Sequence, residues 1–211
     1  MHAKPFVFMR HGRTQANAEH LICGRTDVPL SAQGQAQARA AQALLQPHAW
    51  SCVVVSTALR ARQTAALAVP GVPQWALAQL CERAWGALEG LPVSQLCAYT
   101  DTPPDGEPWA DFVARIAQGM AQVLTQVERP LIVAHSGVWR ALRYAWTGSP
   151  QGERLANAQP MWVHPPQADR GWHWGALPPA ASLPWPAVPP CMPADSAKPA
   201  IPLHHSMQLA K

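Results

Sequence analysis

The sequence contains no run of basic residues and no lysine-rich arm, although its net charge is +4 at pH 7. Charged residues make up only 13% of the 211 residues, and most of the basic ones are arginines that stand singly or in pairs. Nucleic-acid-binding proteins concentrate positive charge in a patch or a tail, so this pattern disfavours nucleic acid as a partner. Arginine favours small anionic ligands, because its planar guanidinium donates two parallel hydrogen bonds to a phosphate or a carboxylate.

Cysteine pairs with metal-binding or redox spacing are also missing. The five cysteines form no C-x-x-C pair and leave one over, which argues against a disulfide framework and against a zinc site. No apolar stretch is long enough to cross a membrane, and the first apolar run is too short for a secretory signal. We therefore expect a cytoplasmic protein with no membrane partner. His204 and His205 form a pair in the tail that we interpret as solvated, so no metal is predicted.

Short apolar segments alternate with longer alanine-rich segments as far as residue 150. Strands are predicted at 4–9, 51–56, 73–77 and 130–134, and helices at 31–46 (with Ser31 as N-cap), 57–69, 109–128 and 137–147. Continuous apolar strands that alternate with helices predict a mainly parallel sheet covered on both faces, a three-layer α/β sandwich. Segments 161–164 and 172–174 are predicted to close the sheet as an edge hairpin.

The composition changes near the C-terminus. Residues 1–176 are predicted to form one domain, and residues 177–211 are rich in proline and alanine. Such a proline density prevents regular helix or sheet, so this part is predicted to be an extended or irregular C-terminal extension.

Polar side chains follow two of the predicted parallel strands. Arg10 and His11 come directly after the first strand, and His135 follows the strand at 130–134. The carboxyl ends of parallel strands meet at one edge, which is where such sheets bind ligands. Arg60 begins a helix after the second strand, and Glu82 lies in a glycine-rich loop. Each residue alone has an ordinary structural interpretation, but together they indicate an anion-binding site at this edge.

This set of residues resembles the histidine phosphatase superfamily, in its phosphoglycerate mutase-like group, over residues 4 to about 148. GRTDVPLSAQGQAQA at 24–38 is similar to the family's G-x-x-D-x-P-L-[TS]-x-x-G-x-x-Q-A, and DGEPWADFVAR at 105–115 is similar to its G-E-[ST]-x-x-D-F-x-x-R. The resemblance implies a phosphoglycerate mutase-like fold with a small lid. It also implies an enzyme of the histidine acid phosphatase type that hydrolyses phosphoric monoesters without a cofactor.

The resemblance also implies a role for each residue of the site. His11 would be the nucleophile that forms a phosphohistidine, and Glu82 the general acid and base. The phosphate oxygens would be held by Arg10, Arg60 and His135, and the substrate also by Asn17, Cys23, Gly24 and Ser136. Physical chemistry supports such a cluster, because a phosphomonoester dianion repels nucleophiles until cations share its charge. Two positions depart from the family pattern, Cys23 in place of a hydroxyl residue and Ser136 in place of a glycine.

The same core can hydrolyse a phosphate or move it between positions. A mutase must also hold a second anion, yet no lysine or arginine occurs between Arg83 and Arg115, and five acidic residues do. The sequence therefore favours a metal-independent hydrolase acting on a small-molecule phosphomonoester. A mutase-type phosphotransferase and a non-catalytic phosphate-binding protein remain as alternatives. A serine hydrolase is excluded, because AHSGV lacks the glycine of a nucleophile elbow.

Three aromatic residues follow Glu82, namely Trp85, Tyr99 and Trp109. They are equally compatible with contacting a flat or hydrophobic leaving group and with packing the lid onto the sheet. Four kinds of phosphatase would fit the sequence: an α-ribazole-phosphatase-like enzyme, a broad-specificity phosphatase, a sugar-phosphate phosphatase and a nucleotide phosphatase. The oligomeric state is also open, with a homodimer among the alternatives.

Overall fold

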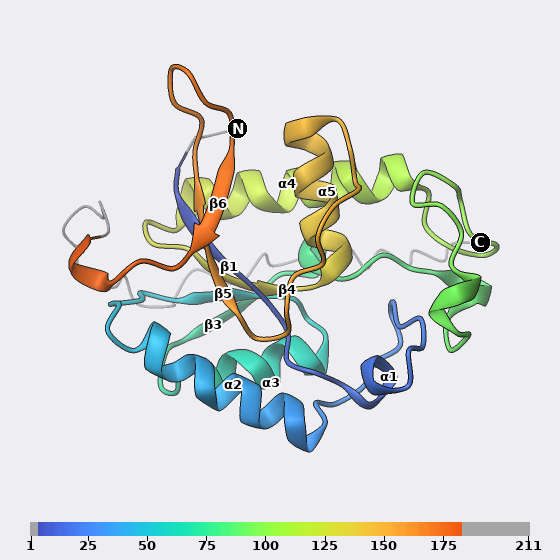
Figure 1. The fold of residues 1–211 in the computed structure, drawn as a ribbon, viewed down its shortest axis with the longest axis horizontal. Helices are drawn as coiled ribbons and strands as arrows, with labels where there is room; N and C mark the ends of the chain where they lie inside the picture. The colour runs from blue at the N-terminus through green and yellow to red at the C-terminus, as the bar shows by residue number, and fades with distance from the viewer. Residues whose placement is uncertain (1–3, 183–211) are drawn as a thin grey trace, which may run out of the picture.

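Continuous apolar segments form the strands of one central sheet, and helices lie on both sides of it (Figure 1). The computed structural model describes residues 4–182. The strands are β1 (Phe6–Arg10), β2 (Val53–Val55), β3 (Gln74–Ala76), β4 (Leu131–Ala134), β5 (Pro160–His164) and β6 (His173–Ala176). The helices are α1 (Gln15–Ala18), α2 (Ala32–Leu45), α3 (Leu59–Ala68), α4 (Trp109–Gln126) and α5 (Ser136–Thr147).

The six strands lie in the order β3-β2-β4-β1-β5-β6. The first four are parallel to one another, whereas β5 pairs antiparallel with both β1 and β6. The mainly parallel sheet and its edge hairpin are therefore as predicted. The central strands are buried on both faces, which explains why their sequences are apolar without alternation.

Side chains of β1 alternate between two hydrophobic cores. Phe6 and Phe8 pack on one face with residues of α4 and α5, and Val7 and Met9 pack on the other with residues of α2 and α3. Figure 1 shows the same arrangement, with α4 and α5 above the strands and α2 and α3 below them. This confirms the three-layer α/β sandwich.

Hydrogen bonds of polar side chains set where the helices begin. Ser31 caps α2 as predicted, since its Oγ accepts a hydrogen bond from the Gly34 amide at 3.1 Å. The next helix begins at Leu59 and not at residue 57, because Asp27 Oδ1 accepts the Leu59 amide hydrogen bond at 2.7 Å. The short helix α1 was not predicted, and its capping box joins Thr14 and Asn17.

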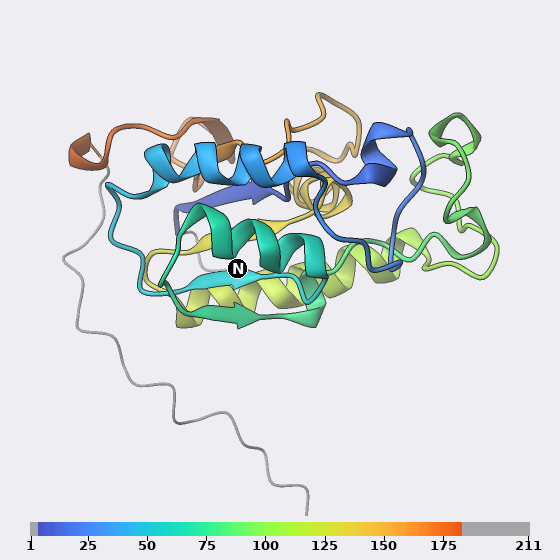
Figure 2. The same ribbon diagram turned by 90° about the horizontal axis from the view of Figure 1, so that it is seen from below.

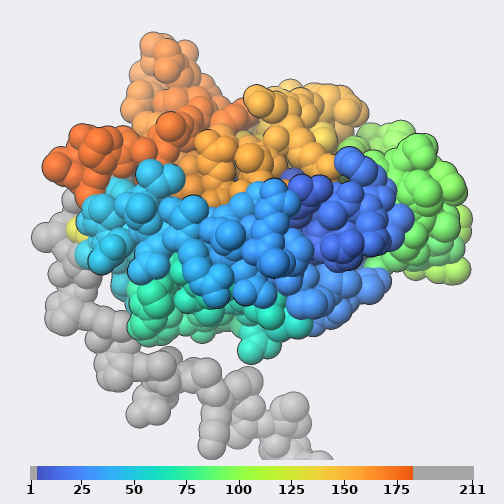
Figure 3. All heavy atoms as spheres, turned by 60° about the horizontal axis from the view of Figure 1, so that its bottom comes forward, coloured from blue at the N-terminus to red at the C-terminus, as the bar shows by residue number. Residues whose placement is uncertain are grey.

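Residues 78–108 form the lid, which contains only short 3₁₀ helices (Ala78–Leu80, Gly86–Leu88 and Val93–Gln95). The lid lies at the same end of the molecule as α1 in Figures 1 and 2, and Figure 3 shows the two segments in contact on the surface. Backbone hydrogen bonds join them, from the Ile22 amide to the Leu91 carbonyl and from the Val93 amide to the His20 carbonyl, both at 2.8 Å. These bonds fix the lid beside the loop that follows β1.

Most of the predicted C-terminal extension, residues 183–211, lies outside the described residues, as do Cys191, His204 and His205. Residues 177–182 contain a short 3₁₀ helix, Ala180–Ser182. The boundary at residue 176 therefore stays a prediction. Between residues 4 and 182, no helix combines the length and the apolar character that crossing a membrane requires.

Candidate active site

A cavity of about 220 Å³ lies between the lid and the carboxyl ends of β1 and β4. Six of the predicted site residues line it, namely Arg10, His11, Asn17, Cys23, Glu82 and Ser136. Arg60 and His135 are buried behind His11, with 1% and 0% of their surface exposed. The sheet brings these residues together as expected, because β1 and β4 are parallel and pair Arg10 with Ala134. The centroids of the His11 and His135 rings consequently lie 5.1 Å apart.

One local hydrogen bond fixes the tautomer of His11. Its Nδ1 lies 2.7 Å from the Gly12 carbonyl oxygen, and since a carbonyl only accepts, Nδ1 must carry the proton. The Nε2 atom then keeps its lone pair. Burial, followed by the charges of Arg60 and Arg10, lowers the pKa of His11 well below its ordinary value. His11 is therefore a neutral imidazole with a free Nε2 at neutral pH.

Two buried arginines supply the positive charge of the site. Arg10 donates from Nη1 to the Leu155 carbonyl at 3.0 Å, and Arg60 donates to the carbonyls of Thr26 and Gly24 at 3.0 and 2.8 Å. Burial lowers the pKa of Arg10 to about 10, so it stays charged at neutral pH. The Arg10 Nε is buried and has no hydrogen-bond partner among the described residues. Because Arg10 also lines the cavity, its charge favours an anionic ligand there.

Ser56 positions His135, and the sequence interpretation did not include it. Its hydroxyl lies 2.7 Å from His135 Nε2 and 3.5 Å from Cys81 Sγ, and both Ser56 and His135 are fully buried. The Nδ1 of His135 is a second buried atom without a partner in the described part of the chain. Burial and the charge of Arg60 lower the pKa of His135, so the ring is neutral at neutral pH.

Two backbone amides orient the carboxylate of Glu82. Oε1 accepts a hydrogen bond from the Arg83 amide and Oε2 accepts one from the Gly137 amide, both at 2.9 Å. A Cβ atom on Gly137 would overlap the Glu82 carboxylate, whereas Ser136 is accommodated in the cavity wall. The position that requires glycine is therefore 137, which explains why serine is tolerated at 136.

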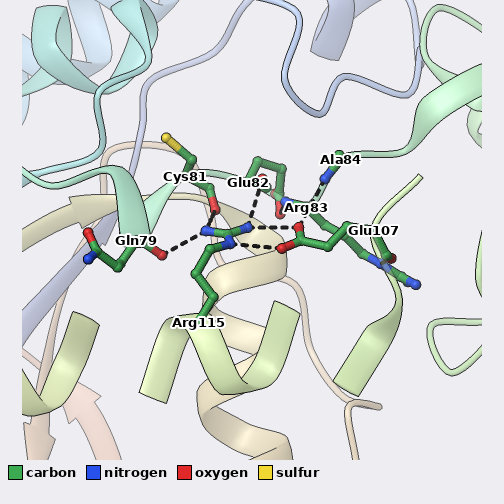
Figure 4. A network of polar contacts seen from close by, with 7 residues as sticks. All are labelled: Gln79, Cys81, Glu82, Arg83, Ala84, Glu107 and Arg115. Carbon is green, nitrogen blue, oxygen red and sulfur yellow. Dashed lines mark hydrogen bonds and ion pairs between the residues drawn. The ribbon is translucent and has the colours of Figure 1, made fainter. Parts of the chain in front are cut away.

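A salt-bridged network holds the segment that carries Glu82 (Figure 4). Arg115 on α4 pairs with Glu107 through Nε and Nη2, each at 2.8 Å, and donates to the carbonyls of Gln79, Cys81 and Glu82. The motif at residues 105–115 thus has a physical role, because its glutamate and arginine fix the backbone around Glu82.

The predicted substrate-binding residues do not all face the cavity. Asn17 and Cys23 line it, but Gly24 is not part of its wall, and the Gly24 carbonyl accepts a hydrogen bond from Arg60. A carbonyl oxygen cannot donate to phosphate, so this group acts by orienting Arg60. The Cys23 thiol points to the Thr26 carbonyl at 3.5 Å.

Two arginines of the cavity wall were missed by the sequence interpretation. Arg140 lies on α5, one turn after the Gly137 that contacts Glu82, and Arg154 lies in the loop before β5. The i, i+3 spacing from Gly137 is a signal that would have found Arg140. Arg154 follows a segment without any periodic pattern, so only the folded structure shows it.

The three aromatic residues that follow Glu82 divide between ligand contact and packing. Trp85 and Tyr99 line the cavity, whereas Trp109 is buried and packs against Phe112 and Tyr144. Tyr99 contacts Trp85 and Trp109 edge to face, with ring centroids 5.6 and 5.8 Å apart. The aromatic residues therefore join the lid to the core and also form part of the binding wall.

Acid should destabilise the protein through its two buried site histidines. In the unfolded chain each takes up a proton as the pH falls through about 6.5, whereas in the folded protein the lowered pKa keeps it neutral. Unfolding therefore binds protons, and the free energy of unfolding should fall below pH 7 by up to about 1.4 kcal/mol per pH unit for each histidine. Urea denaturation at a series of pH values measures this slope between pH 7 and 5. His11→Asn should reduce the slope, and an unchanged slope would contradict the conclusion that folding lowers the pKa of His11.

Comparison with known proteins shows the family. The sequence profile of the histidine phosphatase superfamily (branch 1) matches residues 6–164. The chain is 31% identical over 159 residues to the uncharacterized phosphatase PhoE of Bacillus subtilis, covering 71% of this chain and 82% of the relative. It is 34% identical over 160 residues to a 2,3-bisphosphoglycerate-dependent phosphoglycerate mutase of a Methylobacterium species. The match covers 64% of this chain and 77% of that relative.

Solved structures show the same fold. The alpha-ribazole phosphatase from Shigella flexneri superposes with a TM-score of 0.69 at 24% identity, covering 82% of this chain and 95% of that one. The parallel sheet, the site at its carboxyl edge and the profile match agree with one another. The chain belongs to the histidine phosphatase superfamily, in its phosphoglycerate mutase-like fold.

Proposed function

We propose that this protein hydrolyses small-molecule phosphomonoesters without a metal, through a phosphohistidine intermediate on His11. The observation that carries the proposal is the grouping of Arg10, His11 and Glu82 in the wall of one cavity, with the His135 ring packed against that of His11. The lone pair of His11 Nε2 is free, and the buried Arg10 Nε and His135 Nδ1 have no partner among the described residues. A phosphate bound there would receive positive charge from Arg10 and Arg60 and a hydrogen bond from His135.

In the first step, His11 Nε2 attacks phosphorus and the bond to the ester oxygen breaks. The leaving oxygen takes its proton from the protonated carboxyl of Glu82, which the Arg83 and Gly137 amides hold at the cavity wall. In the second step, the Glu82 carboxylate takes a proton from water as that water attacks the phosphohistidine. The P–N bond then breaks, and phosphate leaves a neutral imidazole behind.

A mutase is the second candidate, and the structure removes one reason that disfavoured it. The acidic residues after Glu82 do not line the cavity. Glu89 accepts hydrogen bonds from the amides of Arg25 and Thr26, and Glu107 pairs with Arg115. A second anion would therefore not meet the repulsion expected from the sequence. Hydrolysis remains the better proposal because the lid is short and the cavity opens to solvent, which gives water access to the intermediate.

Phosphate release from p-nitrophenyl phosphate tests the proposal. Turnover by the purified chain should survive EDTA, because the arginines supply the charge that a metal would otherwise provide. Loss of turnover that magnesium or zinc restores would contradict metal independence. A parallel assay of phosphoglycerate interconversion separates the two candidates, since transfer between positions without phosphate release would favour the mutase.

A further inference from the structure

The cavity contains more positive charge than one phosphate requires. Arg10 and Arg60 surround the place for phosphate beside His11, and Arg140 and Arg154 add two more guanidinium groups to the cavity wall. Glu82 is the one carboxylate in that wall among the described residues, and its oxygens already accept two backbone hydrogen bonds. Even with Glu82 ionised, a bound phosphate dianion would leave one positive charge of the four arginines without a counter-charge.

Arg140 is held in place with donors to spare. Its Nη1 donates to the Pro150 carbonyl at 2.9 Å, and its guanidinium carbon lies 4.7 Å from the centre of the Tyr99 ring. The Nε atom is buried and has no hydrogen-bond partner within residues 4–182. The contact with Tyr99 and the hydrogen bond to Pro150 hold the guanidinium at the cavity wall, so the group is preorganised for an anion.

Arg154 is exposed and makes no hydrogen bond or ion pair with any described residue, yet it lines the same cavity. Arg154 shares the cavity wall with Arg10 and His11, and its charge contributes to lowering the pKa of both. Like charges held this close repel each other, and a bound anion would relieve that repulsion.

We propose that Arg140 and Arg154 form a second anion subsite, so that the preferred substrate carries another anionic group on its leaving part. This inference rests on the proposed function, because it assumes that the ester phosphate occupies the place beside His11. The cavity of about 220 Å³ is smaller than the about 300–1,000 Å³ that holds drug-sized ligands. The substrate class is therefore a small phosphomonoester with a second negative charge.

Binding of two non-hydrolysable probes tests the subsite separately from catalysis. 3-Phosphonopropionate carries a carboxylate, and 3-phosphonopropanamide is its neutral isostere. Calorimetry on the full chain should show that 3-phosphonopropionate binds about tenfold more tightly than 3-phosphonopropanamide. This is the effect expected for a charge-assisted hydrogen bond at a partly exposed site. Arg154→Gln and Arg140→Gln should each bring the affinity ratio close to one. Arg39→Gln, on the exposed side of α2, removes the same charge and should keep the ratio.

Equal affinity for the two probes, no binding of either, or a ratio that survives both cavity substitutions would overturn the subsite. Turnover reports on the proposed function independently. A protein that releases no phosphate from any ester, but shows the charge preference and loses it in Arg154→Gln, would overturn the hydrolase and support the subsite.

Discussion

Replacement of His11 by alanine is expected to lower kcat for p-nitrophenyl phosphate by several orders of magnitude. The imidazole is the one neutral nucleophile that faces the cavity with a free nitrogen, among the residues that the structure describes. Removing a covalent nucleophile leaves only the binding and positioning of the substrate to accelerate the reaction. Steady-state phosphate release measures the loss.

A matched histidine controls for unfolding and for a change in charge. His173 lies on the edge strand β6, stacks on His164 and is far in the fold from the cavity. His173→Ala should keep the turnover of the wild type. Turnover by His11→Ala within tenfold of the wild type would show that the nucleophile lies elsewhere.

Replacement of Glu82 by glutamine is expected to slow the hydrolysis of an alkyl phosphate by about 10²–10⁴-fold, the usual contribution of general acid–base catalysis. Glutamine keeps the size of the side chain but cannot transfer the proton to the leaving oxygen. One of the two backbone amides that now donate to Glu82 would also face an NH₂ group, so part of the loss reflects orientation.

The comparison of two esters in the same variant separates these effects. An aryl phosphate with a good leaving group needs little protonation, so Glu82→Gln should slow its first step much less than that of the alkyl ester. Misorientation would slow both equally. Equal losses in single-turnover experiments on the two esters would therefore contradict the role of Glu82 as general acid.

Much of the fold follows from local sequence patterns. The strands β1, β2 and β4 are unbroken apolar runs, and such runs between helices require a sheet covered on both faces. The side chains that follow β1 and β4 had to meet, because parallel neighbours end at one edge. The sequence alone therefore predicts that His11 and His135 lie together.

Other parts of the site depend on contacts between distant segments. Ser56 follows β2 as His135 follows the neighbouring parallel strand β4, so the same edge argument would have found their contact. Arg154, by contrast, enters the cavity from a loop without periodicity, and no local pattern encodes its place. The expected repulsion of a second anion was wrong for a related reason, since the charge of Glu107 is neutralised by Arg115 eight residues later on α4. Counting charges along the chain does not reveal which of them face a cavity.

The most direct test of the central claim is to trap the phosphoenzyme. A brief incubation with ³²P-labelled substrate followed by an alkaline quench should leave label on the wild-type protein, stable to alkali and released by acid, as expected for phosphohistidine. Peptide mapping should locate it at His11, and Glu82→Gln should accumulate it at least as well with a good leaving group, because water attack is slowed. Label on His11→Ala, or label on another residue of the wild type, would contradict the account.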